Sequence, residues 1–210
     1  MRKLLVVFFA FFATQGLAES HSDLPPKFEL RGATLVYDTE TISNTEIDSE
    51  DVDHLLAILR ANDGLRMLEL NSSGGSVWAG REMARIVIDF GLDTIVHGEC
   101  SSSCVRVFLA GKNRQMTLGS KIGFHQPFWS AANMQSYYEQ WREQDGWATP
   151  FEFSEWVFED TQREFHEDLT YMISRGVDAE FAVKSKGIPN SDNWYPTRVE
   201  LTLAGVLRSE

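Results

Sequence analysis

Apolar and polar residues alternate along most of the chain in a rhythm typical of strands followed by helices. Short apolar runs predict strands, and apolar residues three or four positions apart predict helices. On this basis we expect strands at residues 33–37, 66–70, 93–96, 115–118 and 122–124. We expect helices at residues 49–62, 77–90, 104–110, 153–175, 179–184 and 198–205. Strand, helix and strand in this order predict βαβ crossovers, and therefore an α/β domain with a helical C-terminal portion.

Other stretches lack this periodicity or begin an element. Residues 19–27 are polar and end in Pro25-Pro26, so they predict a linker before the folded part. Residues 128–149 are rich in aromatic side chains without a regular period, and we expect irregular structure there. Ser49, followed by two acids, is expected to be the N-cap of the first helix.

The N-terminus has the pattern of a secretory signal peptide. A basic head, Met1-Arg2-Lys3, precedes an apolar run at residues 4–13, and small residues at Gly16 and Ala18 occupy the cleavage-specifying positions. The apolar run is too short to span a bilayer comfortably. We therefore expect cleavage after Ala18 and a periplasmic or secreted protein with no stable membrane span, an uncleaved anchor being the alternative.

Charge limits the partners of such a protein. Loss of residues 1–18 removes two basic residues and takes the formal net charge from −12 to −14. An acidic surface repels phosphate backbones and anionic lipid heads, which argues against nucleic acid or a membrane surface as a partner. The remaining chain of about 190 residues suits one domain, expected at residues 28–210, with a well-formed core.

Three polar clusters follow predicted strands, where open α/β sheets place their sites. Residues 71–76, Asn-Ser-Ser-Gly-Gly-Ser, could turn backbone amides toward a developing oxyanion, or form a plain glycine turn. Residues 98–104, Gly-Glu-Cys-Ser-Ser-Ser-Cys, could point a serine into a cleft or use it as a helix cap. Residues 123–127, Gly-Phe-His-Gln-Pro, hold a histidine that is either a base or a structural residue.

In this order the three clusters resemble the proteolytic subunit of the Clp protease, over about residues 47–128 and more weakly over 195–207. The resemblance implies a spiral of β-β-α units of the ClpP/crotonase type. It also implies that Ser102 is the nucleophile and His125 its general base. The backbone amides expected to form the oxyanion hole are those of Gly74, Gly75 and Ser103, with Gly74 and Ser103 as the first choice.

The chain departs from the Clp pattern on both sides of the histidine cluster. Cys100 and Cys104 replace the usual small residues beside the serine, and the pattern looks closer to a group of exported Clp-like proteins. In an oxidising compartment two thiols this close can be bridged. The alternative is a pair of small buried thiols. After Pro127 the sequence also lacks the long amphipathic helix of the family.

The acid of the catalytic triad is open at the sequence level. The resemblance places it in Ser191-Asp192-Asn193-Trp194-Tyr195, where a match without gaps selects Asn193 and a shift of one residue selects Asp192. Either could orient an imidazole, but only Asp192 could stabilise its cation. A bare Ser-His dyad is the third alternative.

Other features predict no additional chemistry. Gly111-Lys112 lacks the rest of a phosphate-binding loop, and the remaining histidines have no metal-ligand spacing, so we expect neither cofactor nor metal. The aromatic stripe at residues 153–172 is expected to be core or subunit interface. The acids of the same helix are expected to form its solvated face. They are Glu155, Glu159, Asp160, Glu164, Glu167 and Asp168.

These features together predict an exported, homo-oligomeric serine endopeptidase. Exported compartments lack ATP, so we expect hydrolysis of peptides or already unfolded chains without an unfoldase partner. Two alternatives remain from other classes of protein. One is a non-catalytic binding or assembly module that kept the fold, and the other is a crotonase-like acyl-transfer enzyme.

Overall fold

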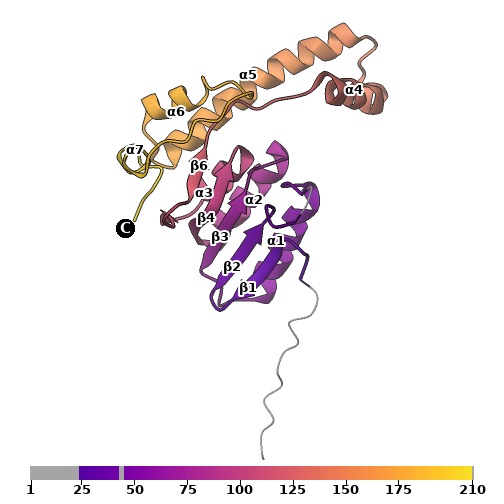
Figure 1. Ribbon diagram of the computed structural model, residues 1–210. Helices are drawn as coiled ribbons and strands as arrows, with labels where there is room; N and C mark the ends of the chain where they lie inside the picture. The colour runs from indigo at the N-terminus through magenta and orange to yellow at the C-terminus, as the bar shows by residue number, and fades with distance from the viewer. Residues whose placement is uncertain (1–23, 43–44, 210) are drawn as a thin grey trace, which may run out of the picture.

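The computed structural model describes residues 24–42 and 45–209 (Figure 1). The predicted signal peptide lies outside the described residues, as does most of the predicted linker. Within the described part of the chain, no helix combines the length and the apolar character that crossing a membrane requires.

A six-stranded sheet forms one layer of the molecule, with the order β1-β2-β3-β4-β5 and with β6 paired to β4 as well. β1 and β2 are antiparallel, and the other pairs are parallel. β4 is long enough to pair with β5 through its first half and with β6 through its second. The strands are β1 Phe28–Arg31, β2 Thr34–Asp38, β3 Met67–Ser72, β4 Asp93–Ser101, β5 Arg114–Met116 and β6 Lys121–Gly123.

Seven helices belong to the described part of the chain. They are α1 Ser49–Ala61, α2 Val77–Phe90, α3 Ser103–Leu109, α4 Ala131–Asp145, α5 Pro150–Ser174, α6 Ala179–Ser185 and α7 Arg198–Leu203. The first three lie beside the sheet, whereas α4 to α7 gather beyond the end of it that β6 approaches (Figure 1). The predicted α/β domain with a helical C-terminal portion is therefore what the chain forms.

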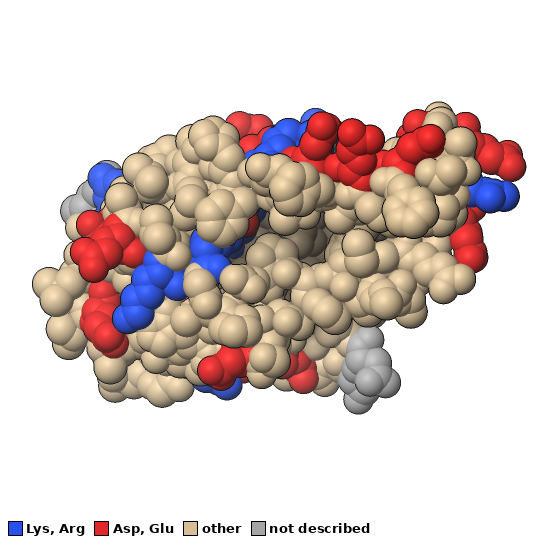
Figure 2. Space-filling model, turned by 90° about the horizontal axis from the view of Figure 1, so that it is seen from above, with Lys and Arg blue, Asp and Glu red and all other residues tan. Residues whose placement is uncertain are grey.

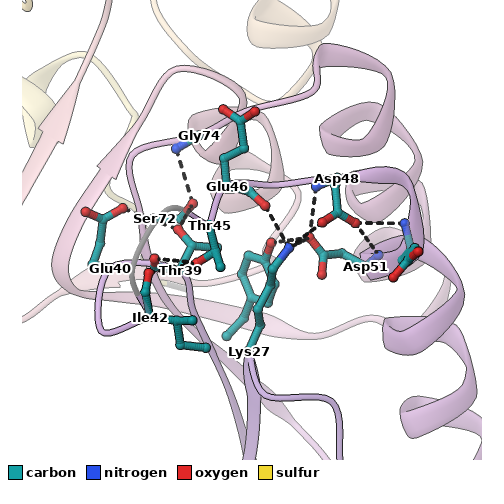
Figure 3. A network of polar contacts seen from close by, with 12 residues as sticks. Lys27, Thr39, Glu40, Ile42, Thr45, Glu46, Asp48, Asp51, Ser72 and Gly74 are labelled. Atoms are coloured by element: carbon teal, nitrogen blue, oxygen red, sulfur yellow. Dashed lines mark hydrogen bonds and ion pairs between the residues drawn. The ribbon is translucent and has the colours of Figure 1, made fainter.

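The N-terminal end of the sheet differs from the prediction. β1 was not predicted, because Phe28–Arg31 has only two apolar residues; it forms by pairing with β2 across a turn at Gly32, whose φ is 62°. Lys27, the last residue of the predicted linker, belongs to the folded part of the chain. The Lys27 ammonium donates to Asp48 at 2.6 Å and to Asp51 at 2.9 Å (Figure 3). Burial lowers the pKa of Lys27, but these hydrogen bonds outweigh it and raise the pKa above the ordinary value.

The N-cap of the first helix lies one residue before the predicted one. Asp48, rather than Ser49, is the N-cap of α1, and its carboxylate accepts from the N–H groups of Glu50 and Asp51. The Asp51 carboxylate in turn accepts from the N–H of Asp48 at 2.9 Å, which completes a capping box. Asp51 is buried, and its carboxylate is satisfied there because Tyr37 and Lys27 also donate to it.

The expectation of irregular structure at residues 128–149 is wrong, because α4 occupies most of that segment. None of the residues of α4 is buried, which explains why its sequence shows no apolar period. The helix is instead held to α5 by an aromatic cluster. The ring of Tyr137 stacks on Trp156 at 5.9 Å and lies 6.2 Å from Trp147. α4 and α5 thus form a helical hairpin after Pro127, of which the sequence predicted only the second helix.

A buried arginine binds the C-terminal helical segments to the sheet. Arg114, at the start of β5, is 2% exposed, and its guanidinium donates to the carbonyl groups of Leu109, Arg175, Gly205 and Val206. Burial lowers its pKa to about 10, so the group is still charged at neutral pH. Arg114 thus connects the start of β5 to the segments that follow α5 and α7.

We predict that Arg114→Met lowers the free energy of unfolding by roughly 3 kcal/mol, because four buried or partly buried carbonyl groups lose a charged donor. Urea denaturation followed by circular dichroism measures the change. Arg85→Met is the matched control, since Arg85 is exposed and binds only Glu82 on its own helix. It should change stability by less than about 0.5 kcal/mol. Equal effects of the two substitutions would contradict the role assigned to Arg114.

Candidate functional site

The three polar clusters meet at the carboxyl end of the sheet. Ser72 of β3 pairs with Cys100 of β4, and Ser101 of β4 pairs with Gly123 of β6. Parallel strands end at the same edge, so the loops that follow β3, β4 and β6 lie next to one another. The site is therefore assembled by strand register rather than by proximity in the sequence.

Ser102 stands at the turn from β4 into α3 with φ 55° and ψ −127°. It is the only residue other than glycine with a positive φ in the described part of the chain. Such a conformation costs a residue with a side chain on the order of 1–3 kcal/mol and persists only where the surroundings impose it. Its N–H donates to the carbonyl of Gly123 at 3.2 Å, and its hydroxyl makes no capping hydrogen bond to α3. The turn presents the serine instead of using it as a cap.

A disulfide joins Cys100 to Cys104 across this turn. Both cysteines are fully buried, one at the end of β4 and one in the first turn of α3. Of the two alternatives for this pair, the structure has the bridge. The five residues from Cys100 to Cys104 form a covalent ring that includes Ser102. The strained backbone of Ser102 is therefore tied on both its N-terminal and its C-terminal side.

Only one of the three consecutive serines has a hydroxyl left for chemistry. Ser101 is buried and donates to the Glu99 carboxylate at 2.5 Å. The Ser103 hydroxyl donates to the carbonyl of Gly75 at 3.2 Å. No hydrogen bond joins the Ser102 hydroxyl to another described residue, and Ser102 lines a pocket of about 70 Å³.

His125 lines the same pocket as Ser102. Its Nδ1 lies 2.7 Å from the carbonyl oxygen of Gln126. Because a carbonyl oxygen can only accept, Nδ1 carries the proton in this contact, and Nε2 keeps the lone pair that a general base needs. Figure 2 shows the face that carries the C-terminal helices, and this face is hollowed near its centre.

Neither candidate for the triad acid reaches the imidazole. Phe124 and Trp194 exchange two backbone hydrogen bonds of 3.0 Å, which brings the chain before Trp194 alongside His125. The Asp192 carboxylate, however, accepts from the N–H of Asn193 at 2.8 Å. Among the described residues, no hydrogen bond joins His125 to Asp192 or to Asn193. The third member of the triad remains a prediction.

The glycine loop packs directly against Ser102. A methyl group at Gly74 would lie 2.8 Å from the Cβ of Ser102, and one at Gly75 would lie 2.4 Å from the carbonyl oxygen of Ile47. Their φ angles of 108° and 143° also exclude most side chains. Both positions therefore require glycine for close approach of the backbone.

The donors available at this loop differ from the first choice made from the sequence. The N–H of Gly74 already donates to the Ser72 hydroxyl at 3.2 Å, and Thr39 donates to the same hydroxyl at 2.9 Å (Figure 3). The N–H of Gly75 has no acceptor among the described residues. The N–H of Ser103 belongs to the first residue of α3 and has no acceptor within the helix. The free pair is thus Gly75 and Ser103.

The prediction of a solvated acidic face on α5 is wrong for Asp168 and Glu164, whereas Glu167 is exposed. The Asp168 carboxylate is 17% exposed and binds the Arg106 guanidinium and the Lys186 ammonium. Glu164 and Glu167 bind Arg81 at 3.1 and 3.4 Å. Burial raises the pKa of Glu164, with Arg81 opposing the rise. These partners come from α2, α3 and the end of α6, so no local pattern identifies them.

Arg106, Asp168 and Lys186 line the pocket of Ser102 and His125 and were missed as site residues. One local signal existed, because Asp168 stands four positions before the buried Met172 and thus on the apolar side of α5. The described residues contain no cluster of three or more His, Cys, Asp and Glu side chains that could hold a metal ion.

With this geometry the fold can be compared with solved structures. ClpP1 from Listeria monocytogenes is similar with a TM-score of 0.58, and an asparagine-to-aspartate mutant of it with 0.56. Each is 16% identical, over 83% of this chain and 88% of that chain. The fold is ClpP-like. This confirms the fold class expected from the three motifs, whereas no protein-family model and no curated protein matches the sequence.

The position of the disulfide across the Ser102 turn predicts a specific role for it. Replacing both cysteines, Cys100→Ala/Cys104→Ala, should cost about 2 kcal/mol of stability, since a five-residue ring removes little entropy from the unfolded chain. It should slow the reaction of Ser102 with a fluorophosphonate far more, by on the order of tenfold or above, because the turn loses its imposed geometry.

Thermal melts and labelling time courses measure the two effects on the same samples. Protein taken from its native compartment should be lighter than its reduced form by two hydrogen atoms. Two freely alkylated thiols in that material would reject the bridge.

Proposed function

We propose that the protein is an exported serine endopeptidase that cleaves peptides or unfolded chains without ATP. One observation carries the proposal: Ser102 is held at a strained strand-to-helix turn, with its hydroxyl uncommitted, in the pocket that also contains His125. Structural serines at helix starts normally cap the helix, and this one does not. The ClpP-like fold supports the same reading at the level of architecture.

The residues suggest a two-step hydrolysis. The Ser102 Oγ attacks the carbonyl carbon of the scissile peptide bond while Nε2 of His125 accepts its proton. The N–H groups of Gly75 and Ser103 donate to the oxygen that becomes negative. The imidazolium then protonates the leaving amine, and an acyl-enzyme remains. Water attacks the acyl group, gives its proton to His125, and the Ser102 hydroxyl is regenerated as the acid product leaves.

The cellular setting in this proposal rests on the N-terminal pattern and the disulfide. A signal peptide at residues 1–18 would deliver the chain to a compartment where a bridge between Cys100 and Cys104 persists. We also propose a homo-oligomer. Large apolar side chains on α5 are exposed, among them Phe151 at 85% and Phe158 at 69%, and such surfaces mark protein contacts.

A non-catalytic binding or assembly module is the second candidate. It is favoured by the arrangement of His125, whose ring is bonded neither to Ser102 nor to Asp192 in the described structure. Catalytic hydrogen bonds often tighten only when substrate is bound, so a chemical test separates the candidates better than the distances do. A crotonase-like acyl-transfer enzyme would use the oxyanion pair without Ser102.

The first prediction from the proposed function concerns the nucleophile. A fluorophosphonate should label the wild-type protein on the tryptic peptide that contains Ser102. Ser102→Ala and His125→Ala should each reduce labelling and peptide hydrolysis by at least about 10³-fold while the protein stays folded. Ser101→Ala is the matched control, since its hydroxyl is committed to Glu99. Wild-type activity in Ser102→Ala would exclude the peptidase mechanism, and no labelling of the wild type would favour the binding module.

The second prediction concerns the acid. If Asp192 turns to His125 when substrate binds, Asp192→Ala should lower kcat/KM on the order of 10²-fold or more, and Asn193→Ala only slightly. The reverse order would move the role to Asn193. Small, equal effects would indicate a Ser-His dyad that relies on the Gln126 carbonyl to hold the imidazole. Steady-state kinetics with one peptide substrate distinguish the three results.

A further inference from the structure

Three charged side chains from separate helices line the pocket beside Ser102. Arg106 comes from α3, Asp168 from α5 and Lys186 from the end of α6. Their side chains are only 19%, 17% and 12% exposed. Apolar residues make up much of the remaining wall, including Val105, Leu109 and Met172. Charges enclosed in this way act strongly on a group that enters the pocket, because little water screens them.

Both oxygens of the single acid of this group already bind cations. Oδ1 of Asp168 accepts from Nη1 of Arg106, and Oδ2 accepts from Lys186 at 2.7 Å. Donors remain in excess. Lys186 has three N–H groups and gives one to Asp168, and the buried Nε of Arg106 has no partner among the described residues. The Lys186 ammonium therefore offers free N–H groups to the pocket, and the Arg106 guanidinium adds a second positive charge to its wall.

Charged side chains behind the pocket balance the charges of Arg106, Asp168 and Lys186. Arg81 binds Glu164 and Glu167, and its Nη2 lies 3.9 Å from Asp168. The three cations and three acids are neutral as a set. None of Arg81, Glu164 and Glu167 lines the pocket, so the side that faces Ser102 carries two cations and one acid. In Figure 2 acidic side chains gather along an edge of the hollowed face rather than in the hollow.

We propose that this pocket binds a carboxylate of the substrate, next to the carbonyl that Ser102 attacks. The position of the carboxylate rests on the proposed peptidase function. Its source is either an acidic side chain on the residue before the scissile bond or the C-terminal carboxylate of a short peptide. The apolar wall accepts the methylene groups, and Lys186 and Arg106 receive the charge. A neutral amide of the same shape loses the charge-assisted hydrogen bonds and is rejected.

Lys186 is the residue that decides this preference. Its ammonium reaches the pocket, while its carbonyl accepts from the side chain of Gln126, the residue after His125. Substitution of the side chain leaves that backbone contact in place, and Asp168 keeps Arg106 as a partner. Lys184 is the matched control, because it lies on the same helix with its ammonium 4.2 Å from the ring centre of Trp194, outside the pocket.

The experiment measures binding in Ser102→Ala protein, so that no ligand is cleaved. Calorimetry compares acetyl-Ala-Ala-Glu-amide and acetyl-Ala-Ala-Gln with a free carboxyl terminus against acetyl-Ala-Ala-Gln-amide. We expect at least one of the two carboxylates to bind at least tenfold more tightly than the neutral peptide. A preference for the Glu peptide identifies an acidic side chain as the source, and a preference for the free acid identifies a chain terminus.

Added Lys186→Met should reduce the preference to less than threefold, and added Lys184→Met should preserve it. Equal Kd values for all three peptides in Ser102→Ala protein overturn the proposal, as does a preference that survives Lys186→Met in folded protein. If Lys186→Met fails to fold, the comparison of the three peptides decides alone. Failure of the peptidase function would appear separately, as wild-type protein that no fluorophosphonate labels, because the binding measurement does not depend on catalysis.

Discussion

The positive φ of Ser102 is the constraint around which this end of the molecule is arranged. A residue with a side chain adopts that conformation only when its surroundings leave no other, and here three contacts impose it. The Cys100–Cys104 disulfide closes the turn, the Gly123 carbonyl binds the Ser102 N–H, and Gly74 lets another loop lie against it. Each contact comes from a different strand end, so the turn depends on the register of β3, β4 and β6.

The same register explains why glycine is required beside the serine. Gly75 lies opposite Ile47 in a parallel bridge, in which the Ile47 N–H donates to Gly74 and the Ile47 carbonyl accepts from Ser76. A side chain at Gly75 would collide with the Ile47 backbone. Ser72, at the end of β3, binds Thr39 on one side and the Gly74 N–H on the other. The loop is thus held by hydroxyl and backbone groups at the ends of β2 and β3, and the N–H of Gly75 is left without an acceptor in the part of the chain that the structure describes.

The C-terminal helices complete the site through charge as much as through apolar contact. α5 carries Asp168 between cations from α3 and α6, and Arg114 binds carbonyl groups from the segments after α5 and α7. Partly buried charges stay paired because an unpaired one would be costly. These contacts hold the C-terminal helices beside the pocket. Charged side chains form part of the pocket wall, whereas apolar side chains fill the core of the sheet.

Local pattern alone determined the elements whose buried faces have a clear period, such as the helix at residues 77–90. It also determined the serine and histidine clusters, because both follow predicted strands and strand ends lie together at one edge of a sheet. It did not predict α4, which buries no residue, or β1, which forms only by pairing with β2. The tertiary structure decided which backbone amides are free, that the cysteines are bridged, and that Asp168 faces a pocket. Each of these depends on groups far apart in the chain, since Arg106 and Asp168 are separated by 62 residues and meet only when α5 packs on α3.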